Sequence, residues 1–180
     1  MQLREVSLYA ADAFPRGWRK IATLLGDVPA IDPTIFRHDG LWWLFATVGG
    51  DSKLFAWHAS NLFGPWRPHA RNPIKTDISS ARPGGMPFVY RGTLYRPAQD
   101  CSETYGGRVV FNRVISLSPT SFFEEAAAVL SPDRHGPFPA GLHTVCAAGV
   151  MTVIDGKRML LRPPEVYLRT VVRAVTGGGR

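Results

Sequence analysis

The chain has 180 residues, of which 45% are hydrophobic and only 19% are charged. This composition is typical of a globular domain and excludes a disordered or fibrous chain. The two cysteines, Cys101 and Cys146, are too few for a disulfide framework or a four-thiolate zinc site. We therefore expect no cofactor and no bound metal.

No segment reaches the roughly 18 uninterrupted apolar residues of a membrane-spanning helix. The first 16 residues also lack the apolar core of a secretory signal. The sequence thus predicts a cytoplasmic protein with no integral membrane segment. No motif favours nucleic-acid binding.

The net charge of +7 is concentrated near the end of the chain, because residues 157–180 contain six basic residues and one acidic residue. We assign residues 1–160 to one domain and residues 161–180 to a basic C-terminal tail. Pro163-Pro164 and the glycines at 177–179 favour a frayed, solvated end for this tail.

Taken in chain order, the predicted elements are strands. Phe14–Trp18 echoes the later Phe63–Trp66, so the chain is expected to open on the outer strand of a blade. Three hairpins follow, and each joins two apolar runs through a pair of residues that ends in glycine. They are centred on Asp39-Gly40, Arg91-Gly92 and Asp155-Gly156. Such pairs supply the positive φ of a tight hairpin turn.

The three hairpin glycines are 52 and 64 residues apart, a period that suits a four-stranded propeller blade. Leu54–Ala59 and Asn61–Trp66 are the expected third and fourth strands of the first repeat. Arg108–Arg113 and Glu125–Leu130 are those of the second. Between these last two, Ser118–Glu124 begins like a capped helix, so one short helical turn is expected there.

The sequence therefore predicts an all-β fold, a partial propeller with about two full blades, a final hairpin and one outer strand. A closed propeller needs about four blades or more. We expect either a truncated reading frame or self-association that covers the open blade edges.

In a propeller the first strand of each blade lines the central channel. Asp32-Pro33, Arg82-Pro83 and His143 mark the starts of three such strands. An acid, a cation and an imidazole together suit a polyhydroxylated or phosphorylated ligand. Structural roles stay open for each: Asp32 as a turn initiator, Arg82 as a bridge between loops, His143 as a core histidine.

Two further features surround these positions. Gly84 and Gly85 would allow a close backbone approach to a ligand. Gln99, Asp100 and Tyr105 lie at or after a hairpin strand and are side-chain types that contact sugars, although a hydrogen-bonded loop needs the same residues.

Several motifs carry a family resemblance: Asp32–Phe36, Ser80–Gly84, Leu94–Cys101 and Gly141–Thr144. They resemble the N-terminal domain of glucosamine inositolphosphorylceramide transferase, which is similar to the five-bladed propellers of glycoside hydrolase family 43. The resemblance covers about Phe14 to Arg158. It implies a five-bladed fold whose first two blades are absent from this chain.

The resemblance also implies site roles. In the related glycosidases the Asp of an Asp-Pro pair tunes the site and a third-blade Glu donates a proton. Asp32 matches the former and is the catalytic candidate. The donor's place holds Ala81-Arg82, which cannot give up a proton, so the sequence leaves open whether this transferase- or glycosidase-related chain is an enzyme.

We predict a carbohydrate-active, glycosidase-like domain that binds a polar or anionic glycan, or a phosphorylated sugar. Arg82 would meet an anionic group, and Asp32 and Gln99 would meet hydroxyl groups. A non-catalytic protein-interaction propeller and an inactive truncated fragment are the alternatives.

Overall fold

The computed structural model describes residues 4–162 and 165–176. Strands are the regular elements of these residues, and no helix occurs among them. The strands are β1 (Glu5–Ala13), β2 (Arg16–Gly26), β3 (Ile31–His38), β4 (Leu41–Thr47), β5 (Lys53–Ala59), β6 (Arg67–Pro68), β7 (Lys75–Thr76), β8 (Phe88–Tyr90), β9 (Thr93–Asp100), β10 (Arg108–Leu117), β11 (Phe122–Leu130), β12 (Val145–Ala148), β13 (Met151–Arg162) and β14 (Glu165–Thr176). The predicted all-β class is confirmed.

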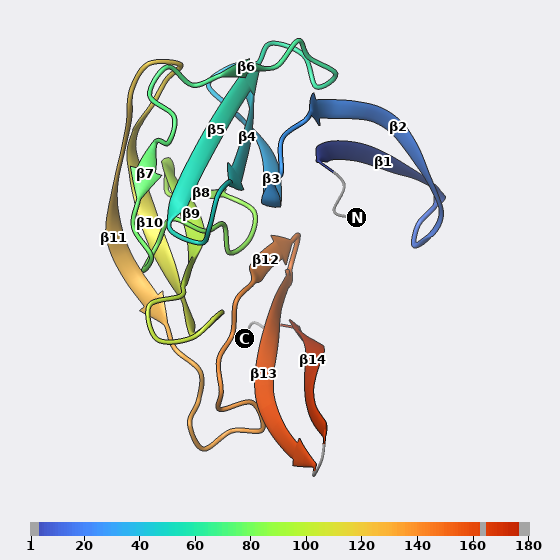
Figure 1. Cartoon of the computed structure of the whole chain (residues 1–180), viewed down its shortest axis with the longest axis vertical. Helices are drawn as coiled ribbons and strands as arrows, with labels where there is room; N and C mark the ends of the chain where they lie inside the picture. The colour runs from blue at the N-terminus through green and yellow to red at the C-terminus, as the bar shows by residue number, and fades with distance from the viewer. Residues whose placement is uncertain (1–3, 163–164, 177–180) are drawn as a thin grey trace.

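Four antiparallel sheets follow one another in chain order. They are β1-β2, then β3-β4-β5-β6 with β7 also paired to β5, then β8-β9-β10-β11, and last β12-β13-β14. The sheets lie around an arc that runs from β1 and β2 through β3–β11 to β12–β14 (Figure 1). Each sheet is a meander of sequential neighbours, as in a propeller blade.

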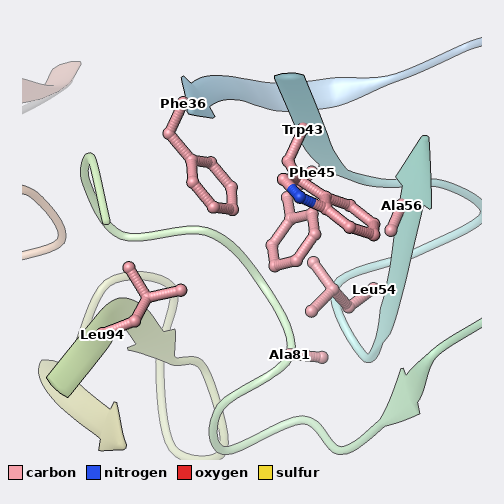
Figure 2. Packing of buried hydrophobic residues seen from close by; sticks show 7 residues of the cluster. All are labelled: Phe36, Trp43, Phe45, Leu54, Ala56, Ala81 and Leu94. Atoms are coloured by element: carbon pink, nitrogen blue, oxygen red, sulfur yellow. The ribbon is translucent and has the colours of Figure 1, made fainter. Parts of the chain in front are cut away.

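Consecutive sheets pack face to face, and β4 shows why its sequence is apolar at nearly every position. Trp43 and Phe45 point into the core between the second and third sheets, where Phe36, Leu54 and Leu94 also lie (Figure 2). Leu44 and Ala46 point the other way, into the core shared with the first sheet. A strand covered on both faces needs apolar residues on both.

The first two predicted hairpins are confirmed, and their corners have the expected geometry. Asp39 and Gly40 have φ of 46° and 78°, and Arg91 and Gly92 have φ of 50° and 78°. Two consecutive positive φ values match the twist of a two-residue hairpin turn. These corners join β3 to β4 and β8 to β9.

The predicted position of the third hairpin turn, Asp155-Gly156, was wrong. The turn lies at Gly149, where φ is 59°, and Asp155-Gly156 lies inside β13. The Asp155 carboxylate accepts hydrogen bonds instead of turning the chain, and the Phe138 side chain packs against Gly156. The hairpin glycines 40, 92 and 149 are then 52 and 57 residues apart, a more regular period.

Other expectations also differ from the structure. The chain opens on a two-stranded hairpin, β1-β2, instead of one outer strand. Residues 61–66 form no strand and contain only a bend and a short turn, and the fourth strand of that sheet is the short β6. Ser118 caps a turn by accepting from the Ser121 amide at 3.0 Å, but no helical turn follows because Phe122 starts β11.

Residues 165–176, expected to belong to a frayed tail, pair with β13 as β14. The division of the chain at residue 161 falls within β13 and stays a prediction. Within the described ranges, no helix could cross a membrane.

Candidate functional site

Asp32 lies in an irregularity at the start of β3. The register between β3 and β4 shifts between Ile31 and Thr34, and Asp32 has a φ of 50°. A non-glycine residue in this left-handed region is costly, and such outliers cluster at functional sites. The bulge re-aims the Asp32 carboxylate toward the neighbouring sheet, where its partners lie.

Arg82 is held between two carboxylates. Its Nε donates to Asp32 Oδ2 at 2.7 Å, and its Nη1 donates to Asp51 Oδ1 at 2.5 Å. Burial acts to lower the pKa of Arg82, but the hydrogen bond and charge of Asp32, with Tyr105 and Asp51, outweigh it and raise the pKa. Arg82 is therefore a permanent cation, and its two partners neutralise it.

Gln99 and Asp100 end β9 but point in opposite directions, as neighbours on a strand do. Gln99 Nε2 donates to Asp32 Oδ2 at 2.8 Å and to the Pro83 carbonyl at 2.7 Å. Asp100 instead accepts from Ser102 and from Arg108 Nε. It lines a separate hollow of about 380 Å³ beside Arg108. Burial acts to raise the pKa of Asp100, but the contacts with Ser102 and Arg108 outweigh it and lower the pKa.

Tyr105 and His143 extend the cluster toward the fourth sheet. The Arg82 guanidinium carbon lies 4.7 Å from the centre of the Tyr105 ring, a cation–π distance. The His143 ring centre lies 5.4 Å from the same ring. Burial raises the pKa of the Tyr105 phenol, although the Arg82 charge acts in the opposite direction.

Asp155 fixes His143 from the neighbouring strand β13. Its Oδ2 contacts His143 Nδ1, and its Oδ1 accepts from the backbone amides of His143 and Thr144 at 2.9 and 2.7 Å. Burial acts to raise the pKa of Asp155, but these hydrogen bonds outweigh it and lower the pKa. The Asp155 contact engages Nδ1 of His143, and the other ring nitrogen, Nε2, takes no part in it.

The two glycines after Arg82 serve packing rather than ligand access. A side chain on Gly84 would lie 2.8 Å from the Ala98 backbone, and one on Gly85 would overlap the Val145 carbonyl. These glycines let the chain after Arg82 lie directly against β9 and β12. The expected approach to a ligand is thus replaced by an approach to neighbouring backbone.

Five of the six residues singled out in the sequence form one cluster: Asp32, Arg82, Gln99, Tyr105 and His143. Asp100 faces away from it. Sequence reasoning missed Asp51, which lies in the loop between β4 and β5 and belongs to no recognised motif. It also took Asp155 for a turn residue. The Gly49-Gly50 pair, with φ of 73° and 110°, was the one local signal of a special loop before Asp51.

A family model described as the N-terminal part of glucosamine inositolphosphorylceramide transferase 1 matches residues 1–135. The chain belongs to this family. The match covers β1 to β11, and therefore Asp32, Asp51, Arg82 and Gln99 but not His143.

Curated relatives agree with the glucosamine inositolphosphorylceramide transferase family. The chain is 40% identical over 129 residues to glucosamine inositolphosphorylceramide transferase 1 of Oryza sativa subsp. japonica, which covers 67% of this chain and 17% of the relative. It is 35% identical over 147 residues to the Arabidopsis thaliana protein, covering 75% and 19%. The chain thus spans less than a fifth of the length of the relatives it matches.

Solved structures show the fold. A glycoside hydrolase family 43 protein from Bacteroides ovatus, GH43B, matches with a TM-score of 0.50 at 19% identity, over 97% of this chain and 37% of that one. An exo-β-1,3-galactanase from Phanerochaete chrysosporium matches with a TM-score of 0.52 at 14% identity, over 87% and 38%. The chain has the architecture of part of these propellers.

The position that the resemblance gives to a proton donor holds no acid. Ala81 is fully buried, and Arg82 is bound to two carboxylates. Neither side chain can release a proton at neutral pH. The site is therefore built from hydrogen-bond acceptors around a cation.

Proposed function

We propose that this chain is a glycan-binding, glycosidase-like domain in which Asp32 and Asp51 accept hydrogen bonds from sugar hydroxyls. The supporting observation is that the aspartate and arginine side chains of these ion pairs are unequally exposed to solvent. Each aspartate side chain is 37% exposed, whereas that of Arg82 is 10% exposed. What the cluster offers to solvent is therefore carboxylate oxygen. A carboxylate is a strong acceptor for hydroxyl donors.

The charge of the cluster favours a neutral part of the glycan at this point. One guanidinium between two carboxylates leaves a net charge of one unit negative. An anionic group would meet two carboxylates before it met Arg82. We therefore revise the expected role of Arg82 from a ligand contact to the residue that holds both acceptors in place.

Gln99 and Tyr105 have different roles in this proposal. Gln99 is 1% exposed and uses its amide nitrogen on Asp32 and Pro83, so it orients Asp32. Tyr105 is 46% exposed, and its ring contacts both Arg82 and His143. Its hydroxyl is the part suited to a sugar contact.

Binding suits this site better than cleavage. Hydrolysis of a glycosidic bond needs one carboxyl group as an acid and a second about 5–9.5 Å away. Asp32 and Asp51 both accept hydrogen bonds from Arg82, so both carboxylates are already engaged as acceptors by the same cation. Asp32 stays the residue for which we predict a catalytic role, and the transferase reaction in the relatives' names stays a proposal for this chain.

Two further expectations stay proposals. The five-bladed ring follows from the family resemblance, and the cytoplasmic location follows from the sequence. A protein-interaction role is the second candidate function, because Val89 and Tyr90 on β8 are 62% and 55% exposed. Self-association through such apolar surface would raise the mass seen by sedimentation.

The test of glycan binding is titration of the isotope-labelled chain with neutral mono- and disaccharides, followed by NMR, with glucose 6-phosphate as the anionic comparison. We expect shifts near Asp32 and Asp51 with the neutral sugars. Asp51→Asn should lower the affinity about 10-fold, since a hydrogen bond to a charged group contributes about 1.5 kcal/mol.

Asp12→Asn serves as the matched control, because Asp12 is an exposed aspartate paired with Arg19 away from the cluster. It should leave the affinity unchanged. Unchanged affinity in both Asp51→Asn and Arg82→Gln would contradict the proposal.

A further inference from the structure

A buried ion pair lies beneath the loop that carries Arg82. Arg96 on β9 and Glu124 on β11 have side chains that are 1% and 2% exposed. Arg96 Nε donates to Glu124 Oε2 at 2.8 Å, and its Nη2 donates to Oε1 at 2.5 Å. This is a two-pronged contact, and it leaves other guanidinium hydrogens free to bind elsewhere.

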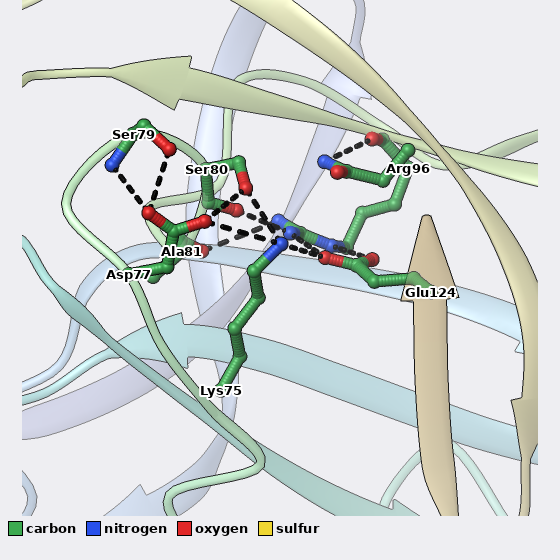
Figure 3. Close-up of polar contacts among 8 residues, drawn as sticks. Lys75, Asp77, Ser79, Ser80, Ala81, Arg96 and Glu124 are labelled. Atoms are coloured by element: carbon green, nitrogen blue, oxygen red, sulfur yellow. Dashed lines mark hydrogen bonds and ion pairs between the residues drawn. The ribbon is translucent and has the colours of Figure 1, made fainter. Parts of the chain in front are cut away.

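Those remaining hydrogens bind the backbone immediately before Arg82. Arg96 Nη2 donates to the Ser80 carbonyl at 2.5 Å, and Nη1 donates to the Ala81 carbonyl at 3.2 Å (Figure 3). On the other side, the backbone of Arg82 accepts from the Gln99 amide at 2.8 Å. Arg82 is thus fixed between a side-chain contact and a strand contact, both from β9.

Lys75 and Asp77 complete the support. Lys75 Nζ donates to Glu124 Oε1 at 2.8 Å and to Ser80 Oγ at 2.6 Å. Asp77 accepts from the amide of Ser79 at 2.9 Å and from Ser80 Oγ at 2.7 Å. The residues from Asp77 to Ala81 belong to no strand, so these side-chain contacts take the place of a sheet ladder.

A buried ion pair is a poor way to gain stability, because apolar residues of similar volume often stabilise as well or better. Apolar residues could not, however, bind the Ser80 and Ala81 carbonyls. The two positive and two negative side chains of this network balance in charge while fixing the direction of one loop. Burial acts to raise the pKa of Glu124, but the charges of Arg96 and Lys75 outweigh it and hold the pKa below its usual range.

We propose that Arg96 and Glu124 are positioning residues for Arg82, and through Arg82 for the Asp32 and Asp51 carboxylates that bind the sugar. This inference rests on the proposed function for its ligand but not for its geometry. The pair does not contact the ligand. It sets the path of the backbone so that the Arg82 guanidinium reaches both aspartates.

The test compares Arg96→Lys with Leu25→Ala by NMR and by sugar titration. Lysine keeps the charge but lacks the fork that binds Glu124 and the two carbonyls together. Leu25 is a core residue between the first and second sheets, and its truncation lowers stability without touching the loop. We expect Arg96→Lys to shift the Arg82 Nε–H signal and to weaken neutral-sugar binding about 10-fold.

Leu25→Ala should change neither the signal nor the affinity, even at an equal loss in melting temperature. An unchanged Arg82 Nε–H signal in Arg96→Lys would overturn the positioning role. Should Arg96→Lys not fold, Glu124→Gln keeps the size of the side chain but removes the carboxylate that receives both prongs of the fork. An unchanged Arg82 Nε–H signal in that variant would overturn the role equally. Absence of sugar binding by the parent chain would contradict the proposed function alone, because the Arg82 signal still reports the geometry.

Discussion

Arg82 Nε donates to Asp32 Oδ2 at 2.7 Å, although the two residues are 50 positions apart, Asp32 on β3 and Arg82 in the segment before β8. The contact joins the starts of two innermost segments of the arc. Both side chains also have other partners, since Arg82 binds Asp51 and Asp32 accepts from Gln99. The pair is thus the junction between the second and third sheets at the site.

We expect Asp32 and Arg82 to be energetically coupled. Removing Arg82 leaves two aspartates without their shared cation, and removing Asp32 leaves a mostly buried guanidinium with one partner fewer. A double-mutant cycle with Asp32→Asn and Arg82→Gln, measured by chemical denaturation, should give a coupling of roughly 1–2 kcal/mol. Additive effects of the two substitutions would show that the contact contributes nothing to stability.

Phe122 should matter far more to stability than its neighbour Phe123. The Phe122 ring packs edge-on against Phe45 with ring centres 5.7 Å apart, which joins β11 to β4 across the core between the second and third sheets. Phe123 is 54% exposed. Phe122→Ala should lower the free energy of unfolding by about 3 kcal/mol. Phe123→Ala should change it by less than about 1 kcal/mol, and equal losses in the two variants would contradict this packing.

Gly85 and Gly92 separate the cost of backbone strain from the cost of overlap. Both have positive φ, 138° and 78°. A side chain on Gly92 would meet open space, whereas one on Gly85 would overlap the Val145 carbonyl. Gly92→Ala should cost about 1 kcal/mol, while Gly85→Ala should cost several times as much or prevent folding. Thermal melts of the two proteins give the comparison, and a smaller loss for Gly85→Ala would refute it.

Local signals predicted much of this fold, because hairpin corners declare themselves in adjacent residues. Asp39-Gly40 and Arg91-Gly92 were placed correctly on that basis. The same pattern failed at Asp155-Gly156, because a distant contact decides what these residues do. Asp155 binds the His143 segment, and Gly156 makes room for Phe138.

The candidate site was predictable only where repeat positions converge. Asp32, Arg82 and His143 were found because each starts an innermost segment. Asp51 comes from a loop between strands, and only its contact with Arg82 in three dimensions reveals it. The sequence also could not show that Asp32 and Asp51 neutralise the charge of Arg82, since that depends on the distances among three segments.

The loop that carries Arg82 should contribute to stability above pH 4 and lose this contribution in acid. Burial acts to raise the pKa of Asp77, but hydrogen bonds from Ser79 and Ser80 and the charge of Lys75 lower it to about 2. The unfolded chain has an aspartate pKa of about 4. A carboxyl group whose pKa is depressed by folding stabilises above its unfolded pKa, and this stabilisation disappears as the pH falls from about 4 through about 2.

Asp77→Asn removes the titrating group while preserving the size of the side chain. The variant should be less stable than the parent at pH 7 by on the order of 1 kcal/mol, after allowance for solvent screening of a partly exposed group. The difference should shrink steadily between pH 4 and pH 2 in denaturation curves. Asp12→Asn is the control, since this exposed aspartate lies on the first sheet. A stability difference between the parent and Asp77→Asn that stayed constant down to pH 2 would contradict the ionised role of Asp77 in holding the loop.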